Sequence, residues 1–190
     1  MEHFYESIPG WFTFPGLYRD MVQRAPADRP SEFVEVGCWK GRSAAFMGVE
    51  IVNSGKPINL ICVDTFTGSA EHSADVSVQN NTLFMEFEHN IEPVKGVVHA
   101  CPLSSIEAAE NMRMWGAEFD FVFIDAAHDK DSVLADITAW FPLVRPGGVI
   151  AGHDWQEAGV NDAVTEFFGR MPGSSYSVDF KQQAWMHTKV

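Results

Sequence analysis

The sequence predicts an α/β fold, in which a doubly wound, mostly parallel sheet lies between two layers of helices and ends in antiparallel strands. Short apolar runs rich in Val, Ile and Phe, typical of buried parallel strands, alternate with segments whose apolar residues recur at helical spacing. The last two β-like runs, 176–180 and 184–190, have no helix between them, which indicates an antiparallel ending. At 190 residues the chain is expected to form one domain, residues 1–190.

The composition argues against several classes of function. A net charge of −13 argues against a nucleic-acid partner, because the phosphate backbone would repel the chain. No apolar run approaches the roughly 20 residues that span a membrane, and the first residues lack the pattern of a signal peptide. The three cysteines, Cys38, Cys62 and Cys101, have no paired metal spacing. We therefore expect reduced, mostly buried thiols and a cytoplasmic protein.

Residues 1–30 are expected to form an N-terminal extension that contains one helix. Apolar residues at helical spacing predict this helix over about 15–24, and prolines follow it. The same region carries an aromatic cluster of Trp11, Phe12, Phe14 and Tyr18. These rings could pack on the sheet, pack on a second subunit of a homo-oligomer, or form a lid over a substrate.

The first β-α unit contains a glycine turn. The expected strand covers 33–36, the turn 37–41 (Gly37-Cys38-Trp39-Lys40-Gly41), and the helix 42–53. Gly37 lets the chain turn tightly, and Gly41 permits a ligand to approach the backbone. Such spacing is common in packed loops. An acid in the preceding strand, Glu35, favours the functional interpretation. Ser43, in the first helical turn, could donate to an anion held by the exposed amides there.

The next strand, 58–63, ends at Asp64, 23 positions after the second glycine of the turn. Doubly wound nucleotide folds place a ribose-binding carboxylate about here, although an acid that only caps a helix is the alternative. Residues 65–93 exceed the usual crossover length and predict an insertion or lid, with a loop over 65–81 and a helix over 82–91.

Three features follow this insertion or lie in it. His72, in the loop, could reach the site, although a solvated loop histidine is the simpler interpretation. A strand is expected over 94–100, and the next helix begins at Ser104 or Ser105, where the sequence is typical of a helix N-cap.

Residues 119–155 form the most informative stretch, a β-α-β unit with a strand over 119–124, a helix over 129–141, a turn at 146–148 and a second strand from 149. Asp125 follows the first strand, and His153-Asp154 follows the second. Because parallel neighbours end at the same edge of a sheet, we expect these side chains to lie close together. Two carboxylates with an imidazole suit a hard divalent cation such as Mg²⁺. His128 lies three residues beyond Asp125 and could face the same ligand.

Less specific interpretations exist for each of these residues. Asp125 could cap the following helix, and His153-Asp154 could cap the helix near Ala158. His128 could be a surface loop residue. The co-location of three polar motifs at one sheet edge favours an active site.

The chain resembles the class I S-adenosylmethionine (SAM) methyltransferases, which have a Rossmann-like, three-layer α/β/α fold. Within them it is similar to the bacterial O-methyltransferases with FVEVGxxxGRS, VDTFxGSxEH, FIDAxH and PGGxxxGHDW segments. This branch is similar to macrocin-type sugar O-methyltransferases and, more distantly, to catechol O-methyltransferase. The resemblance covers nearly all of residues 9–190. One departure is the histidine at 153, where an acid is common.

The resemblance implies a role for each motif. A SAM site would comprise Glu35, Gly37, Cys38, Trp39, Gly41, Ser43, Asp64, Thr65, Ser104, Ser105 and Asp125. Within it, Ser43 would hold the methionine carboxylate and Asp64 the ribose, and Ser104 or Ser105 would lie near the adenine. Asp125, His153 and Asp154 would bind a divalent metal, and His128 matches the position of the general base.

The expected function is methyl transfer from SAM to a hydroxyl of a sugar, polyol or phenol, assisted by Mg²⁺ or another divalent cation. A nicotinamide (NAD)-dependent oxidoreductase would also explain the first unit and Asp64. That class leaves the acidic cluster unused, and its GxGxxG pattern is absent from the sequence. A non-catalytic SAM- or metal-binding protein of the same fold is a further alternative. The expected partner is a small-molecule hydroxyl acceptor, with no nucleic acid and no membrane.

Overall fold

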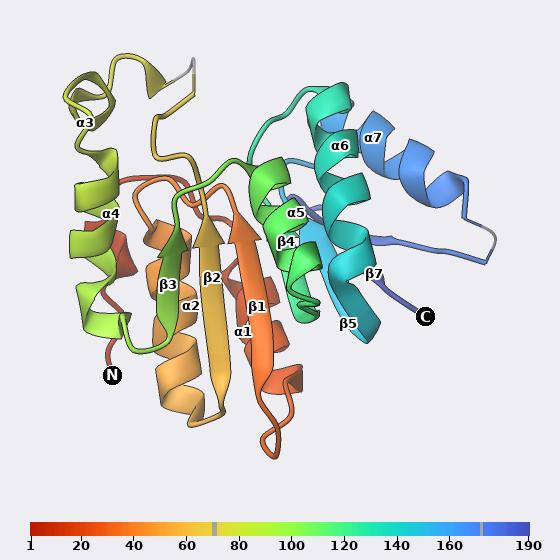
Figure 1. Cartoon of the computed structure of the whole chain (residues 1–190), viewed down its shortest axis with the longest axis horizontal. Helices are drawn as coiled ribbons and strands as arrows, with labels where there is room; N and C mark the ends of the chain where they lie inside the picture. Colours follow the sequence, from red (N-terminus) through yellow and green to blue (C-terminus); the bar gives the residue numbers. More distant parts are fainter. Residues whose placement is uncertain (70–71, 172) are drawn as a thin grey trace.

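A mixed sheet with the strand order β3-β2-β1-β4-β5-β7-β6 organises the chain (Figure 1). This computed structural model describes residues 1–69, 72–171 and 173–190. The strands are β1 Ser31–Val36, β2 Ile58–Val63, β3 Val98–Cys101, β4 Phe119–Ile124, β5 Val144–Gly152, β6 Ser177–Asp179 and β7 Ala184–Thr188. The first five are parallel, whereas β7 is antiparallel to both β5 and β6. The predicted mostly parallel sheet with an antiparallel ending is confirmed.

Helices cover both faces of the sheet, so the chain has the predicted three layers (Figure 1). One buried cluster packs α1, α2 and α4 on one face, and a second packs α5, α6 and α7 on the other. The α-helices are α1 Pro15–Arg24, α2 Arg42–Ser54, α3 Val76–Gln79, α4 Leu83–Ile91, α5 Ser105–Met114, α6 Lys130–Trp140 and α7 Ala158–Gly169, and the 3₁₀ turns are η1 Tyr5–Ser7, η3 Glu92–Val94 and η4 Phe141–Leu143. In the described part of the chain, every helix is too short or too polar to cross a membrane.

The strand register decides where the site lies. Val36 at the end of β1 is level with Val63 of β2 on one side and with Ile124 of β4 on the other. Ile124 is in turn level with Gly152, the last residue of β5. The residues that follow these four strands therefore meet at one edge of the sheet, where open α/β sheets bind ligands.

The predicted turn at 146–148 is wrong. Pro146, Gly147 and Gly148 lie inside β5 as a bulge, where the pairing with β4 shifts between Phe119 and Phe121. The backbone of Lys189, just beyond β7, exchanges hydrogen bonds with Gly147 and Gly148. This pairing keeps the segment in the sheet, because it satisfies backbone groups that a free turn would leave to water.

Two smaller expectations are also corrected. Val94 is not in a strand, because it is the last residue of the 3₁₀ turn η3, which begins at Glu92 and contains Pro93, and because β3 begins only at Val98. The segment 65–81 is not all loop, because Asp75 caps the short helix α3 by accepting from the Ser77 amide.

Candidate active site

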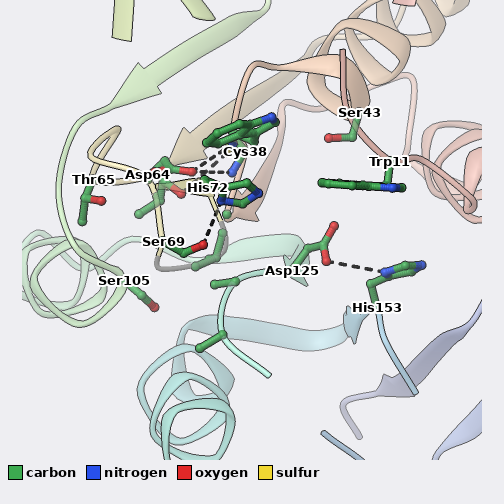
Figure 2. A pocket seen from close by; sticks show the side chains of 18 of the residues that line it. Trp11, Cys38, Ser43, Asp64, Thr65, Ser69, His72, Ser105, Asp125 and His153 are labelled. Carbon is green, nitrogen blue, oxygen red and sulfur yellow. Dashed lines mark hydrogen bonds and ion pairs between the residues drawn. The ribbon is translucent and has the colours of Figure 1, made fainter. Parts of the chain in front are cut away.

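A pocket of about 460 Å³ lies at the carboxyl ends of β1, β2, β4 and β5 (Figure 2). Most of the predicted site residues line it, namely Gly37, Cys38, Trp39, Ser43, Asp64, Thr65, Ser105, Asp125, His128, His153 and Asp154. Three do not: Glu35, Gly41 and Ser104. The strand register explains this gathering, because it brings segments that are far apart in the chain to one edge.

The turn after β1 requires glycine at its first position. Gly37 has a φ of +89°, and a Cβ atom there would lie 2.0 Å from the carbonyl oxygen of Asp125. The Asp125 amide donates to the Val36 carbonyl at 2.8 Å. Gly37 thus allows the first turn to pack directly against the end of β4, which joins the two halves of the pocket.

Asp64 holds this turn in place. Its Oδ2 accepts from the amides of Cys38 and Trp39, each at 2.9 Å, and its Oδ1 accepts from the Phe66 amide at 2.8 Å. A carboxylate has about four acceptor positions, so one remains for a ligand hydroxyl. The ribose-binding role of Asp64 stays a prediction.

Ser43 and Glu35 differ from expectation. The Ser43 hydroxyl makes a short hydrogen bond to Oε1 of Glu35, so the structure does not leave its proton for an anionic ligand. Glu35 is fully buried, and its Oε2 has no hydrogen-bond partner among the described residues. Burial raises the pKa of Glu35 to about 8, against the opposing effect of the Ser43 hydrogen bond. Glu35 is therefore mostly neutral at pH 7, and it does not line the pocket.

Gly41 and Ser104 also have structural roles. A Cβ atom on Gly41, at a φ of +85°, would meet the ring of Phe87 at 3.0 Å, so this glycine makes room for α4. Ser104 caps α5 in a reciprocal capping box with Glu107. Of the two candidates near the adenine, only Ser105 lines the pocket.

The other half of the pocket concentrates ionisable side chains. His128 Nε2 lies 2.9 Å from Asp154 Oδ2, and His153 Nδ1 lies 3.0 Å from Asp154 Oδ1 and 3.6 Å from Asp125 Oδ1. One atom each of Asp125, His128 and Asp154 fall within 4.8 Å of one another. Residue 154 does not cap α7, because Glu157 occupies the N-cap position.

The charges here are strongly coupled. Burial raises the pKa of Asp125, although the nearby imidazoles of His153 and His128 oppose the shift. Burial alone would lower the pKa of His153, but the hydrogen bond that its ring donates to Asp154 and the charges of the two carboxylates leave the pKa above its ordinary value. The pKa of Asp154 is lowered because, although burial opposes this, both histidines stabilise its charged form. The cluster thus holds protons in the neutral pH range.

Sequence reasoning missed Arg42 and Thr13 as site residues. Arg42 lines the pocket, and its Nε is buried with no hydrogen-bond partner among the described residues. A cation in the first turn of a helix opposes the helix dipole, and this signal was available in the sequence. Thr13 Oγ1 lies 2.7 Å from His153 Nε2. Because 140 residues separate this pair, no local pattern could have indicated it.

The cysteines have the predicted character where the structure tests it. Cys38 and Cys62 are free and buried, and Cys101 is partly buried. Burial raises the pKa of all three thiols. One atom each of Glu35, Cys38 and Cys62 also lie within 4.8 Å of one another. Raised pKa values keep this buried group protonated, so it belongs to the core.

Comparisons with known proteins agree with this geometry. The sequence profile of a family described as "Methyltransferase domain" matches residues 34–155. Among solved structures, the O-methyltransferase NovP superposes with a TM-score of 0.69 at 15% identity, over 93% of this chain and 79% of that chain. A comparison with curated protein sequences finds no match.

Two bacterial structures are also similar. A putative caffeoyl-CoA O-methyltransferase from Staphylococcus aureus has a TM-score of 0.67 at 14% identity, over 97% of this chain and 87% of that one. An O-methyltransferase from Bacillus cereus in complex with SAH has a TM-score of 0.65 at 18% identity, over 97% and 86%. At these identities the likeness shows a shared fold.

Proposed function

This chain belongs to the methyltransferase-domain family, and we propose that it transfers a methyl group from SAM to a hydroxyl of a small molecule. The observation that carries the proposal is the position of His128 and two carboxylates at the sheet edge, directly beside the glycine turn. Membership of this family explains the glycine turn of the first β-α unit, so an NAD-dependent oxidoreductase is no longer needed to explain it. The similar solved structures are described as O-methyltransferases, which supports oxygen as the acceptor atom.

The chemistry needs an aligned, deprotonated oxygen. The sulfonium methyl group of SAM is already electrophilic, so the protein mainly has to position the acceptor and remove its proton. His128 is suited to this task, because its side chain is 41% exposed and its Nε2 is paired with Asp154. Asp154 orients the ring and stabilises the imidazolium that forms when His128 accepts the proton.

The first half of the pocket is proposed to bind SAM. Gly37, Cys38 and Trp39 would contact the methionine part, Asp64 and Thr65 the ribose, and Ser105 the adenine side. Since the Ser43 hydroxyl is engaged by Glu35, we assign the methionine carboxylate to the first-turn amides of α2 and to Arg42. A bound SAH in the similar Bacillus cereus structure supports this cofactor.

A divalent cation fits the second half of the pocket, at the ends of β4 and β5. The donor set of two carboxylates and imidazole nitrogens within a few ångströms matches the ligands that such ions take. Asp125, Asp154 and His153 would hold the ion, whose charge would lower the pKa of a nearby hydroxyl. Thr13 would orient the His153 ring through Nε2. The Mg²⁺ requirement and the cytoplasmic location remain predictions.

Isothermal titration with SAH, with and without Mg²⁺, tests the proposal. SAH should bind the wild-type chain with micromolar or tighter affinity, and NAD should not. Mg²⁺ should bind wild type and fail to bind Asp125→Asn, while both proteins retain SAH binding. A titration in which SAH does not bind the wild-type chain would reject methyl transfer. SAH binding with no response to Mg²⁺ would reject only the metal, and methyl transfer from radiolabelled SAM would then be assayed without it.

A further inference from the structure

Asp136 is a buried acid outside the proposed reaction centre. It lies on α6 and is 6% exposed. Burial raises the pKa of its carboxyl to about 6, although the hydrogen bond from Ser105 opposes the shift. The group is therefore mostly charged at pH 7, and a carboxylate can only accept hydrogen bonds. A buried charge costs free energy that an apolar side chain at the same place would not cost, so this acid indicates a role beyond packing.

Asp136 and Trp140 contact the same hydroxyl group on α5. Residues four apart are neighbours on one face of a helix, and this face of α6 packs against α5 in the second buried cluster. The Ser105 hydroxyl donates a short hydrogen bond to Asp136 Oδ1 and accepts one from Trp140 Nε1 at 2.9 Å. Ser104, and not Ser105, caps α5. The two side chains of α6 therefore fix the orientation of a hydroxyl that the helix cap does not use.

The direction of both hydrogen bonds follows from the groups themselves. A carboxylate is only an acceptor, an indole N–H is only a donor, and a hydroxyl has one proton and two lone pairs. Asp136 engages the proton of Ser105, and Trp140 engages one of its lone pairs. One lone pair is left, and Ser105 lines the pocket. Toward a ligand, Ser105 can therefore act only as an acceptor.

Ser105 belongs to the cofactor half of the pocket. It follows β3, which pairs with β2, and β2 leads into Asp64 and Thr65. Figure 2 shows Ser105 and Thr65 on one side of the pocket and Asp125 and His153 on the other. A ligand group that pairs with Ser105 must bring a proton. In SAM, the ribose hydroxyls are assigned above to Asp64 and Thr65, which leaves the 6-amino group of adenine as the donor.

Resting on the proposed function, we propose that Asp136 determines the base specificity of the cofactor site: it holds the Ser105 proton, so Ser105 accepts from the 6-amino group of adenine and disfavours a 6-oxo group. A 6-oxopurine presents an acceptor where adenine presents a donor, and two lone pairs would then face each other with no proton between them. Sites built to hydrogen-bond one ligand reject an analogue that leaves their polar groups unpaired. Asp136 acts through Ser105 and is a positioning residue.

Calorimetric titration at pH 7 with SAH and with its deaminated form, S-inosylhomocysteine, tests this assignment. Wild type should bind SAH about tenfold more tightly, or better, than the inosine analogue. The ratio of the two dissociation constants is the readout, because a purely structural defect weakens both ligands alike. Asp136→Leu frees the Ser105 proton to turn toward the pocket, so the ratio should fall to about threefold or less. Ser105→Ala should lower the ratio as well, by weakening SAH binding.

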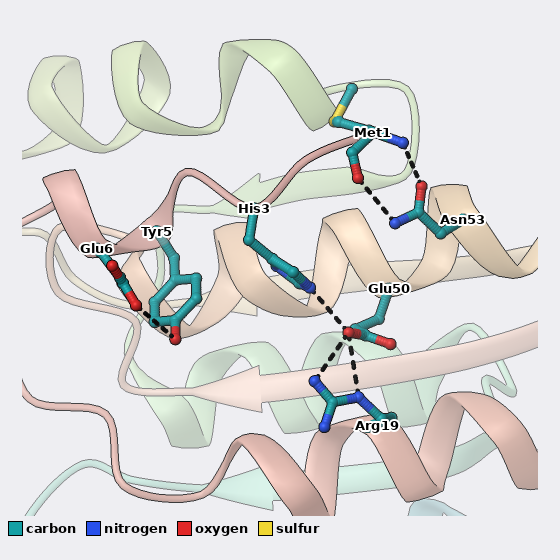
Figure 3. Close-up of polar contacts among 7 residues, drawn as sticks. All are labelled: Met1, His3, Tyr5, Glu6, Arg19, Glu50 and Asn53. Carbon is teal, nitrogen blue, oxygen red and sulfur yellow. Dashed lines mark hydrogen bonds and ion pairs between the residues drawn. The ribbon is translucent and has the colours of Figure 1, made fainter.

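Glu50 on α2 offers a matched control (Figure 3). It also joins separate segments of the chain, because its Oε1 accepts from Arg19 of α1 at 3.3 Å and lies 2.9 Å from His3 Nε2. Its side chain is 17% exposed and does not line the pocket. Glu50→Leu therefore removes a comparable set of contacts away from the ligand, and it should keep the wild-type ratio. Thermal unfolding shows which variants are folded.

The outcomes separate this inference from the proposed function. Equal affinities of wild type for SAH and S-inosylhomocysteine would overturn the inference, while SAH binding keeps the proposed function. A folded Asp136→Leu with the same ratio as Glu50→Leu would also overturn it. If Asp136→Leu does not fold, Ser105→Ala decides, and an unchanged ratio in that variant overturns the inference. Absent SAH binding by wild type would reject both proposals together.

Discussion

The two halves of the pocket use their acids in different ways. In the β1–β2 half, Asp64 accepts three backbone amides and Glu35 is buried against a serine hydroxyl. In the β4–β5 half, Asp125 and Asp154 pair with the titratable imidazoles of His128 and His153. Acids that backbone amides satisfy hold a loop in shape, whereas acids paired with imidazoles can hold and move protons. An acid at a strand end is therefore not by itself a catalytic group.

The largest expected effect comes from removing the imidazole of His128 from the β4–β5 half of the pocket. His128→Ala should lower kcat by about 10²–10⁴-fold, because the proton acceptor is lost. The unfolding midpoint should stay the same, since the side chain is 41% exposed. Rapid-quench methyl transfer and thermal unfolding measure the two effects. His99→Ala, an exposed histidine on β3, is the control. A His128 variant as active as this control would remove the proposed base.

The second expected effect is a loss of stability when Asp64 is removed from the β1–β2 half of the pocket. Asp64→Ala should lower the free energy of unfolding by about 1–3 kcal/mol, because amides of the glycine turn lose their acceptor. Asp64→Asn should be intermediate, since it keeps one acceptor oxygen. Urea denaturation measures these changes, with the exposed Asp20→Ala as the control. An Asp64 variant that loses activity without losing stability would erase the contrast between the halves.

The third expected effect appears only as a pH dependence. Glu35 has a pKa of about 8 when folded and about 4.3 when unfolded. Between these values the folded chain binds one more proton, so its contribution to stability is present below the unfolded pKa and is lost as the pH rises. The expected slope is about −1.4 kcal/mol per pH unit. Glu35→Gln should flatten it in denaturation curves from pH 5 to 8. Parallel slopes in both proteins would show a normal Glu35 pKa.

Much of this fold could be predicted because its signals are local. The helix over Pro15–Arg24 follows from apolar spacing, and the Ser104 cap follows from its capping-box sequence. The bulge at Pro146–Gly148 could not be predicted, because Pro-Gly-Gly signals a turn and only pairing with Lys189 keeps it in the sheet. The packing role of Gly41 could not be predicted for a similar reason. Its spacing indicates a ligand-binding turn, but the residue that needs the space is Phe87 of α4.

The β-α units, the sheet they form and the acids that follow the strands could be predicted from the sequence, because the periods of strands and helices and the connectivity are properties of the chain itself. Three features could be seen only in the folded chain: which acid accepts from backbone amides, which acids pair with imidazoles, and which aromatic ring lines the pocket. Those outcomes depend on register and packing between distant residues such as Thr13 and His153. Burial and hydrogen bonding, which set the protonation of each group, exist only once those distant residues meet.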